Sequence, residues 1–193
     1  MAEQTNIIKR SNNDLFEKEF LPHADALYNF AFHLTYKEED ANDLVQDTFL
    51  KAFRFIDSYE RGTNAKAWLF KILKNGFINE YRRKTRQPNE VDYEDFLTYQ
   101  ETDTAASVGD MDLREDLFKG LIGDEVTKAV NELPVDFRTV ILLSDVEGFT
   151  YEEIAKIIDI PIGTVRSRLH RARNLMKEKL RDYAKKMGYK ENR

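Results

Sequence analysis

Residues 149–176 constrain the fold more than any other stretch of the chain. They read FTYEEIAKIIDIPIGTVRSRLHRARNLM. A short amphipathic helix over Glu152–Ile158 is followed, after a tight junction at Asp159–Ile160, by a second and longer helix. Pro161 suits the first turn of this second helix, which is predicted to run to about Lys186. Two helices joined in this way are typical of a helix-turn-helix.

The longer helix of this pair has one apolar face and one polar face. At about 100° per residue, the apolar face carries Val165, Leu169, Ala172 and Met176. The opposite face is centred on Gly163, Ser167, His170 and Asn174, with Arg166 and Arg171 at its edges. Arginine donates paired hydrogen bonds to a guanine edge, which discriminates between bases by about 1–3 kcal/mol. We therefore predict that this face reads a major groove; the alternative is a basic, solvated helix that only packs on its neighbours.

Three more helices are predicted in the first half of the chain, over residues 14–34, 35–56 and 64–84. Thr35 and Glu38 have the spacing of a capping box, and so do Thr150 and Glu153 in the second half. Asn64 can cap the third helix. In the second half, a helix is also predicted from Asp124 to Glu132 and another after Pro134.

An acidic, weakly periodic segment separates these two sets of helices and is predicted to be a flexible linker. Glycine (8) and proline (4) are sparse, which favours helices over sheets. The prediction is an all-α protein with two small helical domains. Its parts are an N-terminal tail (1–10), a first domain (11–89), the acidic linker (90–122), a second domain (123–187) and a C-terminal tail (188–193).

The charge distribution is more informative than the net charge of −5, which by itself argues weakly against DNA binding. Basic residues cluster at 82–86 and 166–186, and acidic residues at 40–47 and 90–116. The chain has no cysteine, which excludes disulfides and thiolate metal sites. We see no motif for a catalytic, cofactor or metal site and no apolar run for membrane insertion, so a cytoplasmic protein that is not an enzyme is predicted.

Four motifs together resemble one known family. PIGTVRSRLHRAR and the preceding LPVDFRTVILLSDVEGFTYEEIA are similar to region 4 of the sigma-70 family, in its extracytoplasmic-function (ECF, group IV) branch. DANDLVQDTFLKAF resembles the polymerase-binding helix of the family, and WLFKILKNGFINEYRRK resembles its promoter −10 helix. The resemblance covers nearly the whole chain outside the first ten residues and the linker.

The resemblance implies an RNA polymerase sigma factor that binds core polymerase, recognises the −35 and −10 elements and supports transcription initiation. It implies −35 contacts by Thr164, Arg166, Ser167, His170, Arg171, Arg173 and Lys177. It implies −10 contacts by Thr63, Asn64, Asn75, Asn79, Arg82, Arg83, Lys84 and Arg86. Core polymerase binding is implied for Asp40, Asp43, Leu44, Gln46, Asp47 and Phe49.

The implied partners are the β′ clamp helices and β flap of core polymerase and promoter DNA; an anti-sigma factor is common in this group, although no sequence feature identifies one here. Several residues keep a structural alternative: Leu44 and Phe49 as core, Asn64 as a helix cap. Trp68 is expected to be core, and close approach to DNA would explain Gly76 in mid-helix, which costs up to about 1 kcal/mol relative to alanine.

Two other functions stay open at this point. A free-standing helix-turn-helix regulator would bind operator DNA, usually as a dimer, but it would not need the polymerase-binding motif. An interaction protein that mimics the fold would bind a regulator without DNA, and Arg166, Arg171, Asn75 and Asn79 argue against that function.

Overall fold

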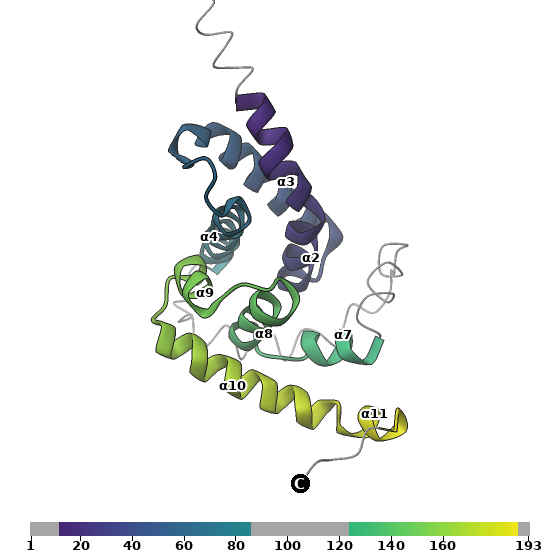
Figure 1. The fold of residues 1–193 in the computed structure, drawn as a ribbon. Helices are drawn as coiled ribbons and strands as arrows, with labels where there is room; N and C mark the ends of the chain where they lie inside the picture. Colours follow the sequence, from purple (N-terminus) through teal and green to yellow (C-terminus); the bar gives the residue numbers. More distant parts are fainter. Residues whose placement is uncertain (1–11, 86–123, 189–193) are drawn as a thin grey trace, which may run out of the picture.

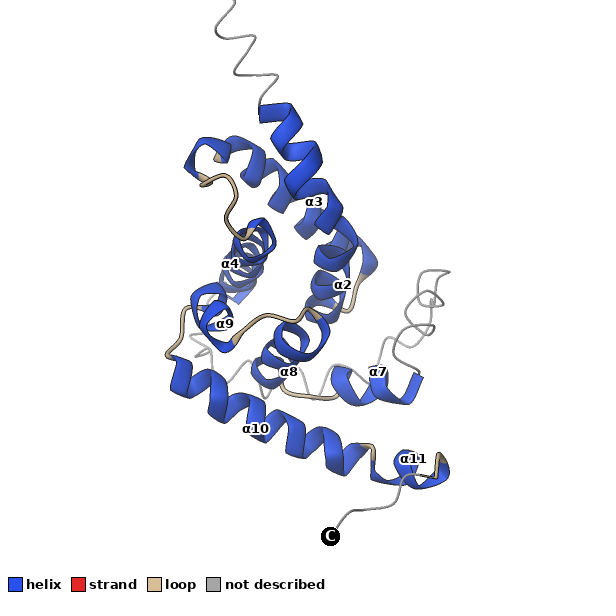
Figure 2. Cartoon of the chain, in the orientation of Figure 1, coloured by secondary structure: helices blue, strands red, loops and turns tan. Residues whose placement is uncertain are grey.

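The computed structural model describes residues 12–85 and 124–188, and within these ranges it contains helices and no strand (Figures 1 and 2). The first lobe consists of η1 (Phe16–Phe20), η2 (Leu21–His23), α2 (Ala24–Thr35), α3 (Glu38–Arg54), η3 (Ile56–Ser58) and α4 (Ala65–Thr85). The second lobe consists of α7 (Asp124–Asn131), α8 (Val135–Ile141), η4 (Leu142–Val146), α9 (Tyr151–Ile158), α10 (Ile162–Lys179) and α11 (Arg181–Lys186). The predicted acidic linker, the N-terminal tail, residues 189–193 of the C-terminal tail and Arg86 lie outside the described residues, as do the side chains of Arg82 and Lys84.

The first predicted helix is interrupted, which corrects the prediction of one helix over 14–34. A π-helical turn at η1 passes into a 3-10 turn at η2 before the regular α2 begins at Ala24. Pro22 stands at the start of η2 and has no N–H to donate to the preceding turn. The chain accommodates it by changing the helical hydrogen-bond pattern on both sides.

The two capping-box spacings have different outcomes. Thr150 is extended and exchanges hydrogen bonds with Glu153, so the box at the start of α9 is confirmed. The box predicted at Thr35 is wrong, because Thr35 is still helical and its hydroxyl donates to the Ala31 carbonyl at 3.0 Å. Tyr36 then takes the left-handed conformation, with φ of 55°, and Lys37 becomes the residue that precedes α3.

The predicted last helix also divides in two. Leu180, with φ of −90° and ψ of 1°, separates α10 from α11. No glycine or proline lies at this break. The sequence therefore carries no local signal for it, and the prediction of one helix to Lys186 is wrong at this residue.

A single hydrophobic core extends through both lobes. Phe30, Phe70 and Leu73 are fully buried in the first lobe, and Leu143 and Ile154 in the second. Burial of each such side chain contributes about 1.5–3 kcal/mol. The lobes share this core because α9 lies against α4 (Figure 1).

Aromatic contacts cross from one lobe to the other. The rings of Phe70 in α4 and Phe149 before α9 meet edge to face at 5.2 Å. Within the first lobe, Trp68 packs on Phe20 and Tyr59 at 5.3 and 5.2 Å, which agrees with its expected core position. The closed arrangement of the two lobes is therefore stabilised by apolar packing as well as by polar contacts.

Candidate nucleic-acid and polymerase interface

The predicted reading helix, α10, presents the polar face that its periodicity predicts. Val165, Leu169 and Ala172 are buried, and Met176 packs partly against the core. The opposite face is exposed at Arg166, Ser167, His170 and Arg171. Thr164 is half-buried at the start of this face, and Lys177 is exposed near its end. The side chains expected at the −35 element thus have room to approach a groove, apart from Arg173.

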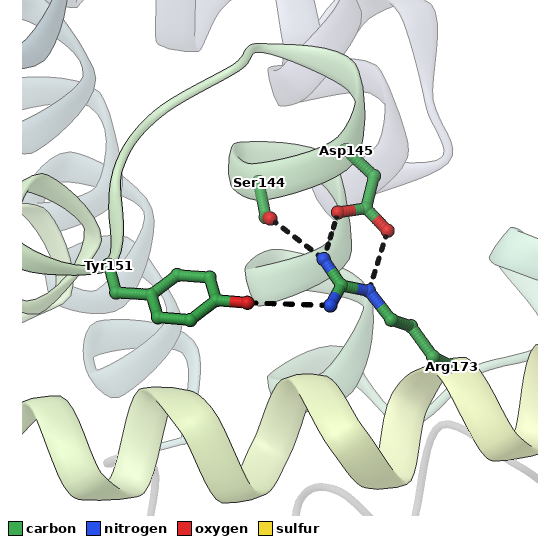
Figure 3. A network of polar contacts seen from close by, with 4 residues as sticks. All are labelled: Ser144, Asp145, Tyr151 and Arg173. Atoms are coloured by element: carbon green, nitrogen blue, oxygen red, sulfur yellow. Dashed lines mark hydrogen bonds and ion pairs between the residues drawn. The ribbon is translucent and has the colours of Figure 1, made fainter.

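Two arginines of α10 are instead engaged with acidic residues of the same lobe. Arg168 Nη2 lies 2.5 Å from Asp136 Oδ2 in α8. Arg173 makes a two-point contact with Asp145 in η4, through Nη2–Oδ1 at 2.6 Å and Nε–Oδ2 at 3.1 Å (Figure 3). These ion pairs fix the orientation of α10 relative to α8 and η4.

Further hydrogen bonds complete the network around Arg173. Its Nη2 donates to Ser144 Oγ at 3.2 Å, and its Nη1 donates to Tyr151 Oη at 3.4 Å (Figure 3). Hydrogen bonding to Asp145 is the main cause that raises the pKa of Arg173. Burial alone would raise the pKa of the Asp145 carboxyl, but the bonds from Arg173 and Ser144 outweigh burial and lower it. A phosphate contact by Arg173 would compete with this network, so we propose a positioning role for Arg173 in place of the expected DNA contact.

The junction between α9 and α10 has the geometry of a tight helix-turn-helix. Asp159 ends α9 in the left-handed conformation, with φ of 58°, and Pro161 immediately precedes α10. At the other end of α9, the backbone N–H of Thr150 is the main cause that lowers the pKa of Glu153, with further contributions from Thr150 Oγ1 and Asn64. Glu153 is therefore a carboxylate near neutral pH.

In the first lobe, α4 exposes Asn75, Asn79 and Arg83 along one stripe, because these residues are spaced four apart. This stripe is where base-reading asparagines were expected. Thr63 is exposed in the preceding turn, and its hydroxyl donates to the Glu60 carbonyl at 2.6 Å. Arg83 is only loosely engaged, with Nη2 3.6 Å from Glu80 Oε1.

Both polar atoms of the Asn64 side chain make a hydrogen bond in this arrangement. Its Oδ1 accepts a hydrogen bond from the Ala67 backbone N–H at 2.9 Å, which confirms its capping role at the start of α4. Its Nδ2 donates to Glu153 Oε1 of the second lobe at 2.6 Å. A base edge would therefore compete with these two bonds for the Asn64 amide while the lobes are closed.

Two lysines of α4 also reach the second lobe. Lys66 Nζ forms an ion pair with Glu147 Oε2 at 2.7 Å and donates to the Glu147 carbonyl at 2.9 Å. The Glu147 side chain is only 8% exposed. Lys74 Nζ donates to the Ile158 carbonyl at the end of α9, at 3.0 Å.

A separate group of polar contacts joins α2 and its C-terminal turn to the second lobe. Arg138, only 4% exposed, donates to the carbonyls of His33 (2.8 Å) and Leu133 (2.7 Å) and stacks on the Tyr36 ring. Tyr36 Oη donates to the Asn131 carbonyl at 2.5 Å, and His33 Nδ1 lies 2.7 Å from Asn131 Oδ1. Burial, opposed by the nearby Arg138 charge, raises the pKa of Tyr36 to about 12.

The expected polymerase-binding face lies on α3. Asp43, Gln46 and Asp47 are exposed there, and Asp40 is partly exposed. Leu44 is only 4% exposed and packs in the core, and Phe49 is half-buried against the Phe16 ring at 5.7 Å. Both apolar residues therefore pack in or against the core, which was the alternative to polymerase binding that the sequence left open for them.

Sequence reasoning missed the most exposed apolar residue on this face. Leu50 is 69% exposed and follows Gln46 by one helical turn, beside Asp47. Its position within the DANDLVQDTFLKAF motif was a signal that could have identified it. An exposed leucine surrounded by acidic and amide groups suits a partner with a basic, partly apolar helix.

A groove between α3 and α4 brings the two expected surfaces together. Its lining includes Asp43 and Asp47 from α3 and Asn79 and Arg83 from α4. Gly76 lies on the floor of this groove, where an added Cβ would approach Leu44 Cδ1 to 3.2 Å. Close packing of α4 against Leu44 accounts for a glycine here, and the expected approach to DNA stays a prediction.

Over residues 12–85 and 124–188, no group of three histidine or acidic side chains is arranged to hold a metal ion. None of the helices described there is long and apolar enough to cross a bilayer.

Comparison with known proteins identifies the family. The profile described as "Sigma-70 region 2" matches residues 20–87, and that described as "Sigma-70, region 4" matches residues 123–176. The chain is 35% identical to "ECF RNA polymerase sigma factor EcfG" of Rhodopseudomonas palustris, over 83% of this chain and 82% of the relative. It is 30% identical to "ECF RNA polymerase sigma factor SigW" of Bacillus subtilis, over 91% and 94%.

A third relative is longer than this chain. "ECF RNA polymerase sigma factor SigE" of Mycolicibacterium smegmatis is 37% identical over 85% of this chain, and the match spans 59% of the relative.

Solved structures give the same family. The sigma factor RpoE of Bartonella quintana, determined in complex with the anti-sigma factor NepR, is 37% identical, covers 86% of this chain and 96% of its own, and superimposes with a TM-score of 0.63. CnrH in complex with the cytosolic domain of CnrY, at 24% identity, covers 90% of each chain with a TM-score of 0.58 and shares the fold. Two regions matched in order, together with relatives of this similarity, place the chain in the extracytoplasmic-function group of the sigma-70 family of RNA polymerase sigma factors.

Proposed function

We propose that three exposed surfaces of this sigma factor divide the work of initiation. The acidic and apolar face of α3 binds core polymerase, the stripe of α4 at Asn75 and Asn79 reads the −10 element, and α10 reads the −35 element. The observation that carries this proposal is the exposure of these surfaces on three different helices, each outside the core. The proposed domain limits are residues 11–89 and 123–187.

Within α10, Arg166 and Arg171 lie at the edges of the exposed face and are suited to bidentate contacts with guanine. Ser167 and His170 lie between them. Lys177, further along, is suited to a phosphate contact, as are the basic residues at the end of α4. The protein is proposed to act in the cytoplasm, without a catalytic site of its own, as an initiation factor for the polymerase.

An anti-sigma factor is a proposed further partner. The Bartonella quintana relative was crystallised with one, and the match covers 96% of that relative and 86% of this chain. The partner here is unidentified, and a search for it would begin with proteins that co-purify with the full chain and block its binding to core polymerase.

Reconstituted transcription tests the proposal directly. Sigma-free core polymerase is mixed with this protein and a library of DNA fragments, and the transcripts are sequenced. We expect initiation at sites that share two elements. Tight binding to DNA in the absence of polymerase, with no association with core, would instead identify a free-standing operator-binding protein.

A further inference from the structure

One stripe of α4 is covered by the second lobe, next to the exposed asparagine stripe. Lys66, Phe70 and Lys74 follow one another at intervals of four residues, so they share a side of the helix. All three contact the second lobe, at Glu147, Phe149 and Ile158 respectively. Lys74 directly precedes Asn75, so the covered stripe adjoins the exposed one.

Phe149 covers Phe70, and the polar groups on either side of it are anionic or electron-rich oxygens. Asn64 and Lys66 donate to the carboxylates of Glu153 and Glu147. Lys74 donates to the carbonyl of Ile158, where the helix dipole of α9 places partial negative charge. Amide and ammonium donors that meet negative oxygens along a helix are also what a protein uses to hold the phosphates of DNA.

We propose that Lys66 and Lys74 are phosphate-holding residues of the −10 surface, and that α9 with its preceding turn covers them in the free chain as a substitute for DNA. The inference deepens the proposed function, on which it rests, because it adds two residues to the DNA surface and names what regulates access to it. Asn64, a predicted base reader, is engaged by the same part of the second lobe.

In the closed arrangement, α9 is not free to contact DNA as the first helix of a helix-turn-helix does. The first helix of a helix-turn-helix crosses the DNA backbone while the second enters the groove. In the closed chain, the N-terminal turn of α9 is turned to Asn64 through Glu153. Promoter DNA and α4 therefore compete for the same end of α9, and the lobes have to separate before both elements can be read.

Glutamine substitutions offer a precise way to weaken the contact. Glu153→Gln keeps a carbonyl oxygen for the Thr150 N–H, since glutamine serves in a capping box, but it can turn an amide N–H toward the N–H of Asn64. Glu147→Gln removes the charge that faces Lys66. Glu152→Gln is the matched control, because Glu152 is exposed in the same turn of α9.

The distance between the lobes of the free chain measures closure. The chain has no cysteine, so exposed Glu39 in α3 and Glu178 in α10 can be changed to cysteine and spin-labelled uniquely. We expect the parent to show one short distance. The Glu147→Gln/Glu153→Gln double variant should shift the ratio of open to closed molecules by about tenfold or more, as for loss of a charge-assisted contact. An identical distance distribution in the parent, the double variant and the Glu152→Gln control would overturn the covering role of α9.

The salt dependence of promoter binding tests the proposed phosphate contacts of Lys66 and Lys74. In the assembled holoenzyme, Lys66→Met and Lys74→Met should each weaken binding to all promoters alike and reduce the slope of log K against log salt by about 1. Lys18→Met, an exposed lysine of η1, should leave the slope unchanged. An unchanged slope in both α4 variants would overturn the DNA role of these lysines.

The two levels of the proposal fail in different ways. If the parent supports promoter-specific transcription with core polymerase but the distances and slopes stay constant, the covering contact is refuted and the proposed function stands. If the parent neither binds core nor initiates, the proposed function is refuted and the DNA role of Lys66 and Lys74 falls with it.

Discussion

Arg173 and Asp145 form a two-point ion pair that ties the reading helix to the turn of helix above it, with N–O distances of 2.6 and 3.1 Å (Figure 3). The family resemblance implied a −35 contact for this arginine. Its guanidinium fork instead matches the carboxylate, and Ser144 and Tyr151 complete its hydrogen bonding. The arginine therefore fixes the position of α10, the helix proposed to read the −35 element.

Arg173→Ala should lower the free energy of unfolding by about 1 kcal/mol, a modest value because both partners are partly exposed and solvent screens the pair. The salt slope of promoter binding should stay as in the parent, since no phosphate contact is lost. Arg171→Ala is the matched comparison on the exposed face, and it should weaken DNA binding without a change in urea denaturation. A reduced slope in Arg173→Ala would return this residue to the DNA-contacting set.

Base reading and phosphate holding should separate between two arginines of different helices. Arg166→Ala removes a side chain suited to a guanine edge, so preference at one position of the −35 element should relax, with a loss of about 1–3 kcal/mol there. Arg83→Ala should weaken binding to all promoters alike. Holoenzyme affinities for a promoter library measure both effects, and equal changes of preference in the two variants would contradict this division.

Leu50→Ala should reduce affinity for core polymerase by about tenfold or more, because an exposed apolar anchor at the centre of an interface contributes over 1 kcal/mol. Folding should be unaffected, since 69% of the residue is exposed. Titration of core polymerase with labelled protein gives the dissociation constant. Leu21→Ala changes an exposed leucine away from α3 and should bind as the parent does.

Acidification should destabilise the protein through His33. Burial is the main cause that lowers the pKa of His33 below 6.5; the Asn131 bond opposes the shift and the Arg138 charge adds to it. Below pH 6.5 the unfolded chain therefore takes up a proton that the folded chain resists. The free energy of unfolding should therefore keep its full value above pH 6.5 and decrease as the pH falls below 6.5.

Urea denaturation at about pH 7.5 to 5.5 tests this prediction, because that range brackets the ordinary histidine pKa of about 6.5. His33→Gln should flatten most of the dependence, with a smaller part left from His23, whose pKa burial also lowers. His170→Gln alters an exposed histidine and should leave the slope as in the parent. A slope that persists in full in His33→Gln would assign it to other groups.

Local patterns predicted most of the helices and the two faces of α10, because helical periodicity depends only on nearby residues. They failed where backbone conformation decided the outcome. Thr35 and Thr150 have the same spacing to a glutamate, but only Thr150 is extended and able to cap. Pro22 was a readable signal for the interruption before α2, whereas the break at Leu180 has no such residue.

The contact between the lobes lay beyond sequence reasoning for a different reason. Asn64 and Glu153 are 89 residues apart, and Arg138 and the His33 carbonyl are 105 apart. Asn64 and Glu153 already had local roles, as a helix cap and as the acid of a capping box. No periodicity or spacing indicates which distant partner a second hydrogen bond will find, so the arrangement of the lobes required the structure.

The meeting of α4 and α9 also affects how this factor competes for a limited supply of polymerase. If only the open chain is competent, its apparent affinity is reduced by the open fraction; at roughly one open molecule in a hundred, about a hundredfold more factor is needed for the same occupancy. Sigma factors without such a contact would therefore occupy the polymerase when the concentration of this protein is low. The few side chains that join α4 to α9 would thus set the cellular concentration of this factor at which transcription from its promoters begins.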